Sequence, residues 1–147
     1  MAGLKYRGAV GIAETMAAQV VTGAPAGLFE RVELVPVPLS ARRRRRRGFN
    51  QAERLAEALA RRTGLRVNDC LERTGAGRPQ VGRDRTERLA AIDGTIAVRL
   101  RAPPPPRALL VDDVLTTGAT LGACAAALRA AGSRWVEGVV YARTPGR

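Results

Sequence analysis

Two neighbouring carboxylates followed by a short run of threonine and glycine form the most distinctive chemical pattern of the sequence. Asp112 and Asp113 come directly after apolar residues 108–111, a run typical of a strand buried on both faces of a parallel sheet. Residues 116–120 then combine hydroxyls with a glycine at a predicted helix start, where backbone N–H groups and the helix dipole attract phosphate. The carboxylates would repel that phosphate but suit an adjacent diol or a divalent cation. The pattern favours a phosphorylated sugar over the alternative, an acidic turn that only precedes a helix.

A second concentration of hydrogen-bond donors follows the apolar segment 32–37. Ser40 and six consecutive arginines at 42–47 occupy the predicted loop between a strand and a helix. Arginine binds phosphate oxygens in a bidentate manner and stays charged at any working pH. Ligands of open α/β sheets bind outside the carboxyl ends of the strands, so both patterns are expected at one edge. Taken alone, the arginine run is equally typical of a solvated surface or a nucleic-acid patch. Together, the two patterns predict a sugar phosphorylated at one end and pyrophosphorylated at the other.

The composition excludes several chemistries. The 147 residues contain no histidine, which removes Ser-His-Asp hydrolysis, Cys-His catalysis and histidine-rich zinc sites. Cys70 and Cys124 form no C-x-x-C pair and are interpreted as small buried thiols of a cytoplasmic protein. Lysine and arginine total 25 against 13 acidic residues, and the resulting charge of +12 favours phosphorylated metabolites, nucleic acid or acidic lipid as partners. A GC-rich coding bias would explain the total charge, but not the clustering of the arginines.

Alternating helical and strand patterns predict an α/β fold with a mostly parallel sheet flanked by helices. Asn50 and Glu53 are spaced as a capping box at the start of an amphipathic helix that ends at Gly64. The length fits a single domain over residues 1–147, and no segment approaches the roughly 20 apolar residues of a membrane span. Helices are expected over 4–21, 50–64, 84–92 and 121–131, strands over 32–37, 95–98, 108–111 and 135–141, and a flexible loop or hairpin over 74–81.

Three segments resemble a known protein family. Residues 111–120, VDDVLTTGAT, are similar to the phosphoribosyl-pyrophosphate (PRPP) motif of type I phosphoribosyltransferases. Residues 35–40, VPVPLS, and 47–52, RGFNQA, resemble the ComF branch of that superfamily, and LKYRG at 4–8 resembles the start of its catalytic region. The resemblance covers nearly the whole chain. It implies the type I phosphoribosyltransferase fold, with a central, mostly parallel sheet and a mobile loop or hairpin over the site.

The resemblance also assigns roles to individual residues. Asp112 and Asp113 would hold the ribose hydroxyls of PRPP and act in catalysis together with Arg47. The 5-phosphate would be wrapped by Thr116, Thr117, Gly118, Ala119 and Thr120. The pyrophosphate would be bound by Ser40, Arg42, Arg43 and Arg47. The mobile loop would include Arg73, Gln80 and Arg88.

The implied reaction is displacement at ribose C1, which transfers phosphoribose from PRPP to an unidentified nitrogenous acceptor. Mg²⁺ would accompany the pyrophosphate and, with fixed positive charge, stabilise it as it departs. No direct protein ligand to Mg²⁺ is assigned, although Asp112 and Asp113 are candidates. The family name implies a link to DNA uptake during competence, and a homodimer is also considered.

The sequence departs from the family pattern in three respects. Many ComF-type proteins begin with a cysteine-rich zinc-binding segment, which this sequence does not show, so no zinc is expected. Ala91 and Ile96 align where the family tends to have asparagine and phenylalanine, and Arg83 stands where an apolar residue is usual. These differences affect the mobile region and leave the phosphate-binding run intact.

The alternative hypothesis is a basic nucleic-acid-binding protein on a catalytically silent phosphoribosyltransferase fold. Aromatic residues make up only 3% of the chain, which is poor for stacking bases, so such binding would be nonspecific and salt-sensitive. It would use Arg42, Arg43, Arg44, Arg45, Arg46 and Arg47. A phosphorelay receiver would need a late strand-end lysine, and nucleotide-binding folds would need glycine-rich motifs; the sequence has neither.

Overall fold

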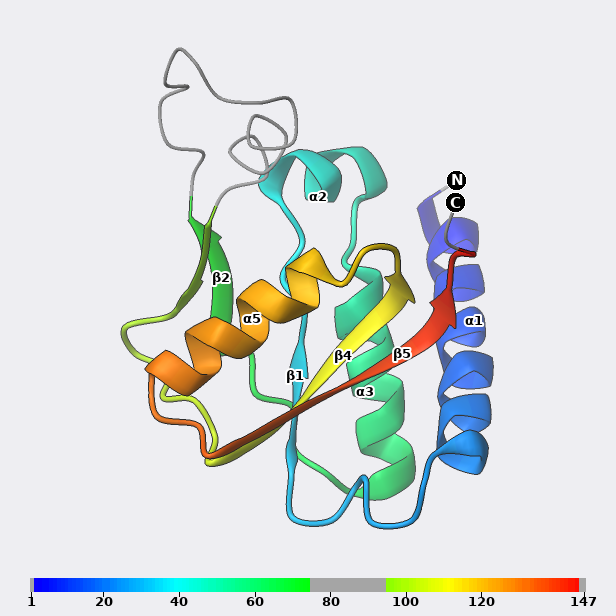
Figure 1. Cartoon of the computed structure of the whole chain (residues 1–147). Helices are drawn as coiled ribbons and strands as arrows, with labels where there is room; N and C mark the ends of the chain where they lie inside the picture. The colour runs from blue at the N-terminus through cyan, green and yellow to red at the C-terminus, as the bar shows by residue number, and fades with distance from the viewer. Residues whose placement is uncertain (1, 75–94, 146–147) are drawn as a thin grey trace.

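The apolar runs of the sequence form a three-stranded parallel sheet, which Figure 1 shows with helices on its two faces. The computed structural model describes residues 2–74 and 95–145. Strand β4 (Arg107–Leu115) is central and pairs in parallel with β1 (Glu33–Pro36) on one side and β5 (Trp135–Arg143) on the other. The predicted α/β fold with a parallel sheet is therefore confirmed.

Helices and a separate strand pair cover the sheet. Helices α1 (Ala2–Gly23) and α3 (Gln51–Thr63) pack together behind it in the view of Figure 1, and α5 (Ala119–Ala130) lies in front. Strands β2 (Leu71–Thr74) and β3 (Thr95–Val98) form an antiparallel pair that packs beside α5. The helices lie close to the positions that the apolar periodicity predicts.

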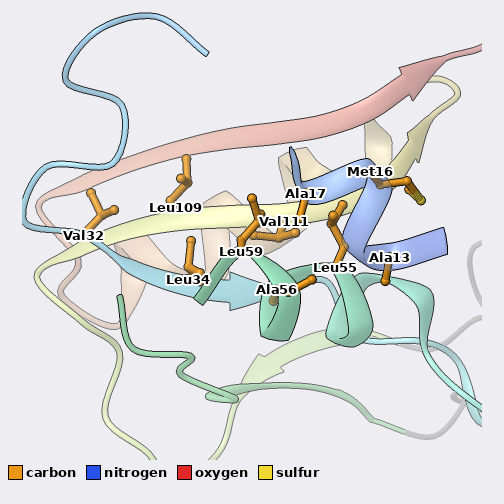
Figure 2. Packing of buried hydrophobic residues seen from close by; sticks show 11 residues of the cluster. Ala13, Met16, Ala17, Val32, Leu34, Leu55, Ala56, Leu59, Leu109 and Val111 are labelled. Atoms are coloured by element: carbon orange, nitrogen blue, oxygen red, sulfur yellow. The ribbon is translucent and has the colours of Figure 1, made fainter. Parts of the chain in front are cut away.

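The core consists of two apolar clusters on opposite faces of β4. Successive residues of a strand point to opposite faces, so Leu109 and Val111 contact α1 and α3 while Ala108 and Leu110 face α5. Figure 2 shows the first of these clusters. All four β4 residues are at most 2% exposed, which explains why this strand is a continuous apolar run rather than an alternating one.

The arginine run is helical, not a loop as the sequence analysis expected. It forms α2 (Ala41–Arg47), which begins where the Ser40 hydroxyl accepts the backbone N–H of Arg43 at 3.3 Å. The helix ends at Gly48, whose φ of +79° is the left-handed conformation that a helix C-terminus favours and that glycine adopts without strain. Arginine is a good helix former, so these two caps are sufficient to define a short helix.

Strand β4 also extends further than expected. The sequence analysis ended it at the acidic pair, but its pairing with β5 continues past Asp112, which is opposite Val140, to Leu115, which is opposite Arg143. The two carboxylates therefore lie on regular strand backbone. This fixes the direction of each side chain.

The predicted capping box is replaced by a different arrangement. Asn50 caps α3 by accepting the N–H of Ala52, while the Glu53 carboxylate pairs with Arg44 of α2 at 3.0 Å. The acidic residue thus links two helices and does not return to the helix N-terminus.

Strand β2 was not predicted, because its four residues, LERT, include charged and polar side chains. It contains Arg73, which the sequence analysis placed in the mobile loop. Gln80, Arg88 and the predicted helix 84–92 lie outside the described residues, as does the predicted hairpin beyond Thr74.

Candidate functional site

A cavity of about 610 Å³ opens at the carboxyl ends of β1 and β4. Its lining combines the acidic pair, part of the threonine-glycine turn, one face of α2 and Arg73 of β2. The lining carboxylates are Asp112 and Asp113, and apolar side chains such as Leu115 and Leu121 complete the wall. Segments that are far apart in the sequence therefore bring cationic, anionic and hydroxyl groups to one place.

The acidic pair is half-buried and internally hydrogen bonded. The backbone N–H of Asp113 donates to the Asp112 carboxylate at 2.9 Å. Burial, followed by the side-chain hydrogen bond with Asp113, raises the pKa of Asp112 to about 7, although Arg73 opposes this shift. Asp112 shares the strand face of Ala108 and Leu110, which is the side covered by α5. The pair offers several oxygen acceptors to a diol, and Asp112 can gain or lose a proton near neutral pH.

The turn before α5 presents backbone and hydroxyl donors to the same cavity. Thr116, Gly118 and Thr120 line it, whereas Thr117 and Ala119 do not. Instead, the Thr117 hydroxyl accepts the N–H of Ala119 at 3.3 Å, which stabilises the turn. Gly118 has a φ of +79° and no side chain to cap the helix, so the start of α5 remains suited to an anion.

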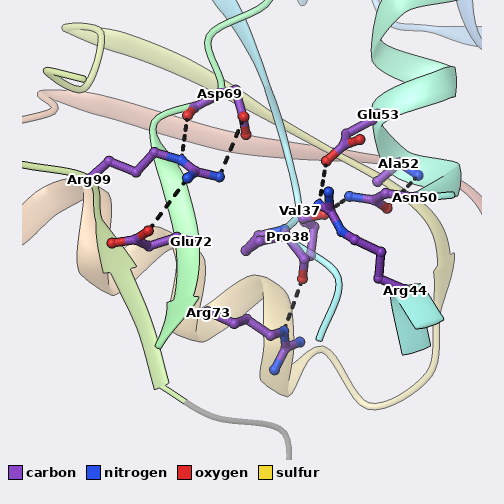
Figure 3. Close-up of polar contacts among 10 residues, drawn as sticks. All are labelled: Val37, Pro38, Arg44, Asn50, Ala52, Glu53, Asp69, Glu72, Arg73 and Arg99. Atoms are coloured by element: carbon purple, nitrogen blue, oxygen red, sulfur yellow. Dashed lines mark hydrogen bonds and ion pairs between the residues drawn. The ribbon is translucent and has the colours of Figure 1, made fainter. Parts of the chain in front are cut away.

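Because α2 is helical, only three of its six arginines line the cavity. Arg43, Arg46 and Arg47 follow helical spacing and all line the cavity. Arg44 lies on another side, where it pairs with Glu53 of α3 (Figure 3). Arg42 and Arg45 are exposed and are not among the lining residues.

Two predicted pyrophosphate residues are therefore placed differently from expectation. Arg42 lies outside the cavity, and Ser40 is only 4% exposed, with its hydroxyl engaged as the cap of α2. Arg46 lines the cavity but was not among the predicted pyrophosphate residues, because a run of identical arginines does not show which of them share a helix face. Arg43 and Arg47 do lie in the cavity.

Asn50 lies at the cavity wall with both ends of its amide engaged. Its Nδ2 donates to the Val37 carbonyl at 3.0 Å and its Oδ1 accepts the N–H of Ala52 at 3.1 Å (Figure 3). This residue, from the RGFNQA segment, joins β1 to α3. From the sequence, Asn50 is predicted as a helix cap, and its bond to Val37 is an additional role.

Arg73, from strand β2, also lines the cavity. Its Nε donates to the Pro38 carbonyl at 2.9 Å, and the residue lines the cavity together with the acidic pair. Arg73 was predicted to belong to the mobile loop, whereas the structure places it in strand β2.

The described residues contain no cluster of three or more His, Cys, Asp or Glu side chains that could hold a metal. Hard carboxylate oxygens suit Mg²⁺, so the acidic pair fits a cation whose remaining ligands come from a bound phosphate and water. Nor does any helix within 2–74 or 95–145 have the length and apolar character needed to cross a membrane.

Comparison with solved structures identifies the fold. A solved structure described as the allosteric regulatory enzyme of purine biosynthesis matches 90% of this chain and 25% of its own, with a TM-score of 0.56 and 19% identity. That likeness concerns the fold, which is the type I phosphoribosyltransferase fold. No protein-family model matches the chain.

Sequence relatives define the branch. Competence protein ComFC of Streptococcus pneumoniae is 34% identical over 109 residues, covering 74% of this chain and 47% of the relative. Competence protein F of Haemophilus influenzae is 35% identical over 107 residues, covering 71% and 47%. ComFC of Bacillus subtilis is 37% identical over 91 residues, covering 60% and 34%. The chain belongs to the ComF family of competence proteins, and it spans about half or less of the length of these relatives.

Proposed function

We propose that this chain binds PRPP with Mg²⁺ and transfers its phosphoribose to a nitrogenous acceptor. The observation that carries the proposal is the convergence of an acidic pair, a threonine-glycine turn and three arginines on one cavity of about 610 Å³. PRPP presents a diol, a monophosphate and a pyrophosphate around one ribose, which matches these three groups in number and charge.

Each group has a distinct task in the proposed reaction. The oxygens of Asp112 and Asp113 accept hydrogen bonds from the ribose hydroxyls and orient the sugar. The turn with Thr116, Gly118 and Thr120 donates to the 5-phosphate through hydroxyl and backbone groups. Both ends of the ribose are thereby held while its C1 carbon reacts.

The arginines act on the leaving group. As the C1–O bond breaks, negative charge develops on the pyrophosphate, and the nitrogen nucleophile forms the new bond to C1 and releases its proton to solvent. Arg43, Arg46 and Arg47 supply fixed positive charge that stabilises this change. Mg²⁺, when bound, neutralises further charge on the pyrophosphate oxygens. The acidic pair binds the diol by accepting its hydrogen bonds, so these residues contribute binding and electrostatics.

The relatives suggest the biological setting. They are competence proteins, so we propose that the activity acts in the cytoplasm on material connected with DNA uptake. A purine, a pyrimidine or another ring nitrogen would satisfy the chemistry.

Thermal unfolding in the presence of PRPP and Mg²⁺ tests the binding step. At a ligand concentration 100-fold above Kd, the free energy of unfolding should rise by roughly 2.7 kcal/mol. Asp113→Asn should weaken this protection without disrupting the fold. Asp69→Asn, an exposed acid paired with Arg99 outside the cavity, is the matched control. Absence of any shift at millimolar PRPP would refute the proposal.

A screen of nitrogenous bases for pyrophosphate release from PRPP tests the transfer step. Release that depends on one base and is lost in Asp113→Asn would identify the acceptor. PRPP protection without release for any base would reduce the function to binding.

A further inference from the structure

The connection between β1 and α2 is held by one further sheet hydrogen bond, from the Val37 N–H to the Val111 carbonyl at 2.9 Å, and beyond it by side chains. Pro38 has no N–H, so it cannot donate a sheet hydrogen bond. Two consecutive carbonyls of this connection accept from side chains of other elements: Val37 from Asn50 Nδ2, and Pro38 from Arg73 Nε. Figure 3 shows both contacts. Beyond Val37, the position of this connection, and of the α2 N-terminus that follows it, therefore depends on side-chain contacts, of which the one at Pro38 comes from Arg73.

Arg73 also faces the opposite wall of the cavity. Its positive charge is close enough to the Asp112 carboxyl to favour the ionised form of that acid. The guanidinium of Arg73 thus contacts the β1–α2 connection at Pro38 and lines the same cavity as the acidic pair on β4.

The strand that carries Arg73 has its own anchors. Cys70 and Leu71 are fully buried, in the same cluster as Cys124 and Leu128 of α5. Arg99, beside β3, pairs with Asp69 and Glu72 away from the cavity. The pairing and burial of β2 and β3 do not require the contact between Arg73 and Pro38, so replacing Arg73 should leave the fold intact.

We propose that Arg73 is a positioning residue that sets the distance between the pyrophosphate-binding arginines and the acidic pair. The proposal rests on the proposed function, because PRPP must span both subsites at once. A ligand that bridges two subsites gains affinity only when their separation matches its length. Each fragment alone, ribose 5-phosphate or inorganic pyrophosphate, needs only one subsite and tolerates a change in their separation.

Calorimetric titration of the full chain with Mg²⁺ and each of the three ligands tests this. Arg73→Gln should weaken PRPP binding at least tenfold. This loss of affinity should exceed the fold-loss for ribose 5-phosphate multiplied by the fold-loss for pyrophosphate. Arg73→Lys, whose ammonium can still donate to the Pro38 carbonyl, should regain most of the PRPP affinity. Arg99→Gln is the matched control and should bind PRPP as the unmodified chain does. Unfolding temperatures without ligand should agree between the unmodified chain and the two Arg73 variants.

The outcomes separate this inference from the proposed function. If the unmodified chain does not bind PRPP, the proposed function fails and this inference fails with it. If it binds PRPP and Arg73→Gln binds equally well, only the inference fails. If Arg73→Gln loses as much affinity for one fragment as for PRPP, Arg73 contacts the ligand directly. If Arg99→Gln loses as much PRPP affinity as Arg73→Gln, the cause is a general loosening of the β2–β3 pair. Either result overturns the positioning role.

Discussion

The side chain of Asn50 connects β1 and α3 by hydrogen bonding in both directions: it donates to the Val37 carbonyl at 3.0 Å and accepts the Ala52 N–H at 3.1 Å. It is only 4% exposed, so water cannot readily replace either partner. The amide carries its donor and its acceptor on two different atoms, whereas a hydroxyl carries both on one oxygen. Serine or aspartate could cap the helix, but neither would supply the Nδ2 donor.

We therefore expect Asn50→Asp to destabilise the fold. The variant keeps the capping oxygen but loses the donor to Val37 and places a charge in a buried position, which should lower the free energy of unfolding by about 1–3 kcal/mol. Denaturant unfolding measures this change. The neighbouring Gln51→Ala should stay within about 0.5 kcal/mol, as expected for a substitution that breaks no buried hydrogen bond. An unchanged midpoint for Asn50→Asp would contradict the structural role.

The acidic pair makes stability depend on pH. Burial, and then the hydrogen bond with Asp113, raises the pKa of Asp112 from an ordinary value near 3.8 to about 7, so the folded state binds a proton that the unfolded state has lost in this interval. Stability should therefore fall as pH rises from about 4 to 7 and then level off. Asp112→Asn should flatten this dependence and be more stable than the unmodified chain at pH 8, as measured by unfolding at several pH values.

Ligand binding should show the opposite trend. The ionised Asp112 accepts hydrogen bonds only and attracts Mg²⁺, so affinity for Mg²⁺-PRPP should rise as pH increases through 7. Asp112→Asn should lose both the affinity and its pH dependence. A steeper stability loss in that variant at high pH would contradict the assignment.

Much of the fold could be predicted because its signals are local. The run 108–111 is apolar at every position, and the structure shows each of these residues buried between two helical layers. The period of α3 and its glycine end are likewise visible in the sequence. The turn at 116–120 could be placed at a strand end because strand, turn and helix are consecutive along the chain, although the strand itself continues through the acidic pair to Leu115.

The remaining features depend on contacts between distant segments. Six identical arginines have no hydrophobic period, so the sequence did not indicate that α2 would direct Arg43, Arg46 and Arg47 to the cavity. The contact of Arg73 with Pro38 joins residues 35 positions apart. Asn50 was recognised as a cap, but its bond to Val37 exists only because β1 ends beside the start of α3.

The direction of each arginine on α2 predicts which substitutions matter. Arg43→Gln should weaken binding of Mg²⁺-pyrophosphate roughly tenfold or more, because a charge-assisted hydrogen bond contributes about 1.5–3 kcal/mol. Arg42→Gln removes the same charge from the adjacent position outside the cavity and should change affinity less than about threefold. Titration calorimetry on the two variants compares them directly. Equal losses would show that only the net charge of the run is recognised.

The two exposed arginines outside the cavity, Arg42 and Arg45, provide a test of nucleic-acid binding. Arg42 and Arg45 are exposed and do not line the cavity, so we expect their charge to be available to a phosphate backbone without displacing PRPP. Any binding of single-stranded DNA through them should weaken linearly in a plot of log affinity against log salt, with a slope of about −0.7 per phosphate contacted. The double variant Arg42→Gln/Arg45→Gln should reduce this slope by roughly one to two while leaving PRPP protection unchanged. A slope that is unchanged in the double variant but reduced by saturating PRPP would instead place the DNA backbone inside the cavity, on the face of α2 that carries Arg43, Arg46 and Arg47.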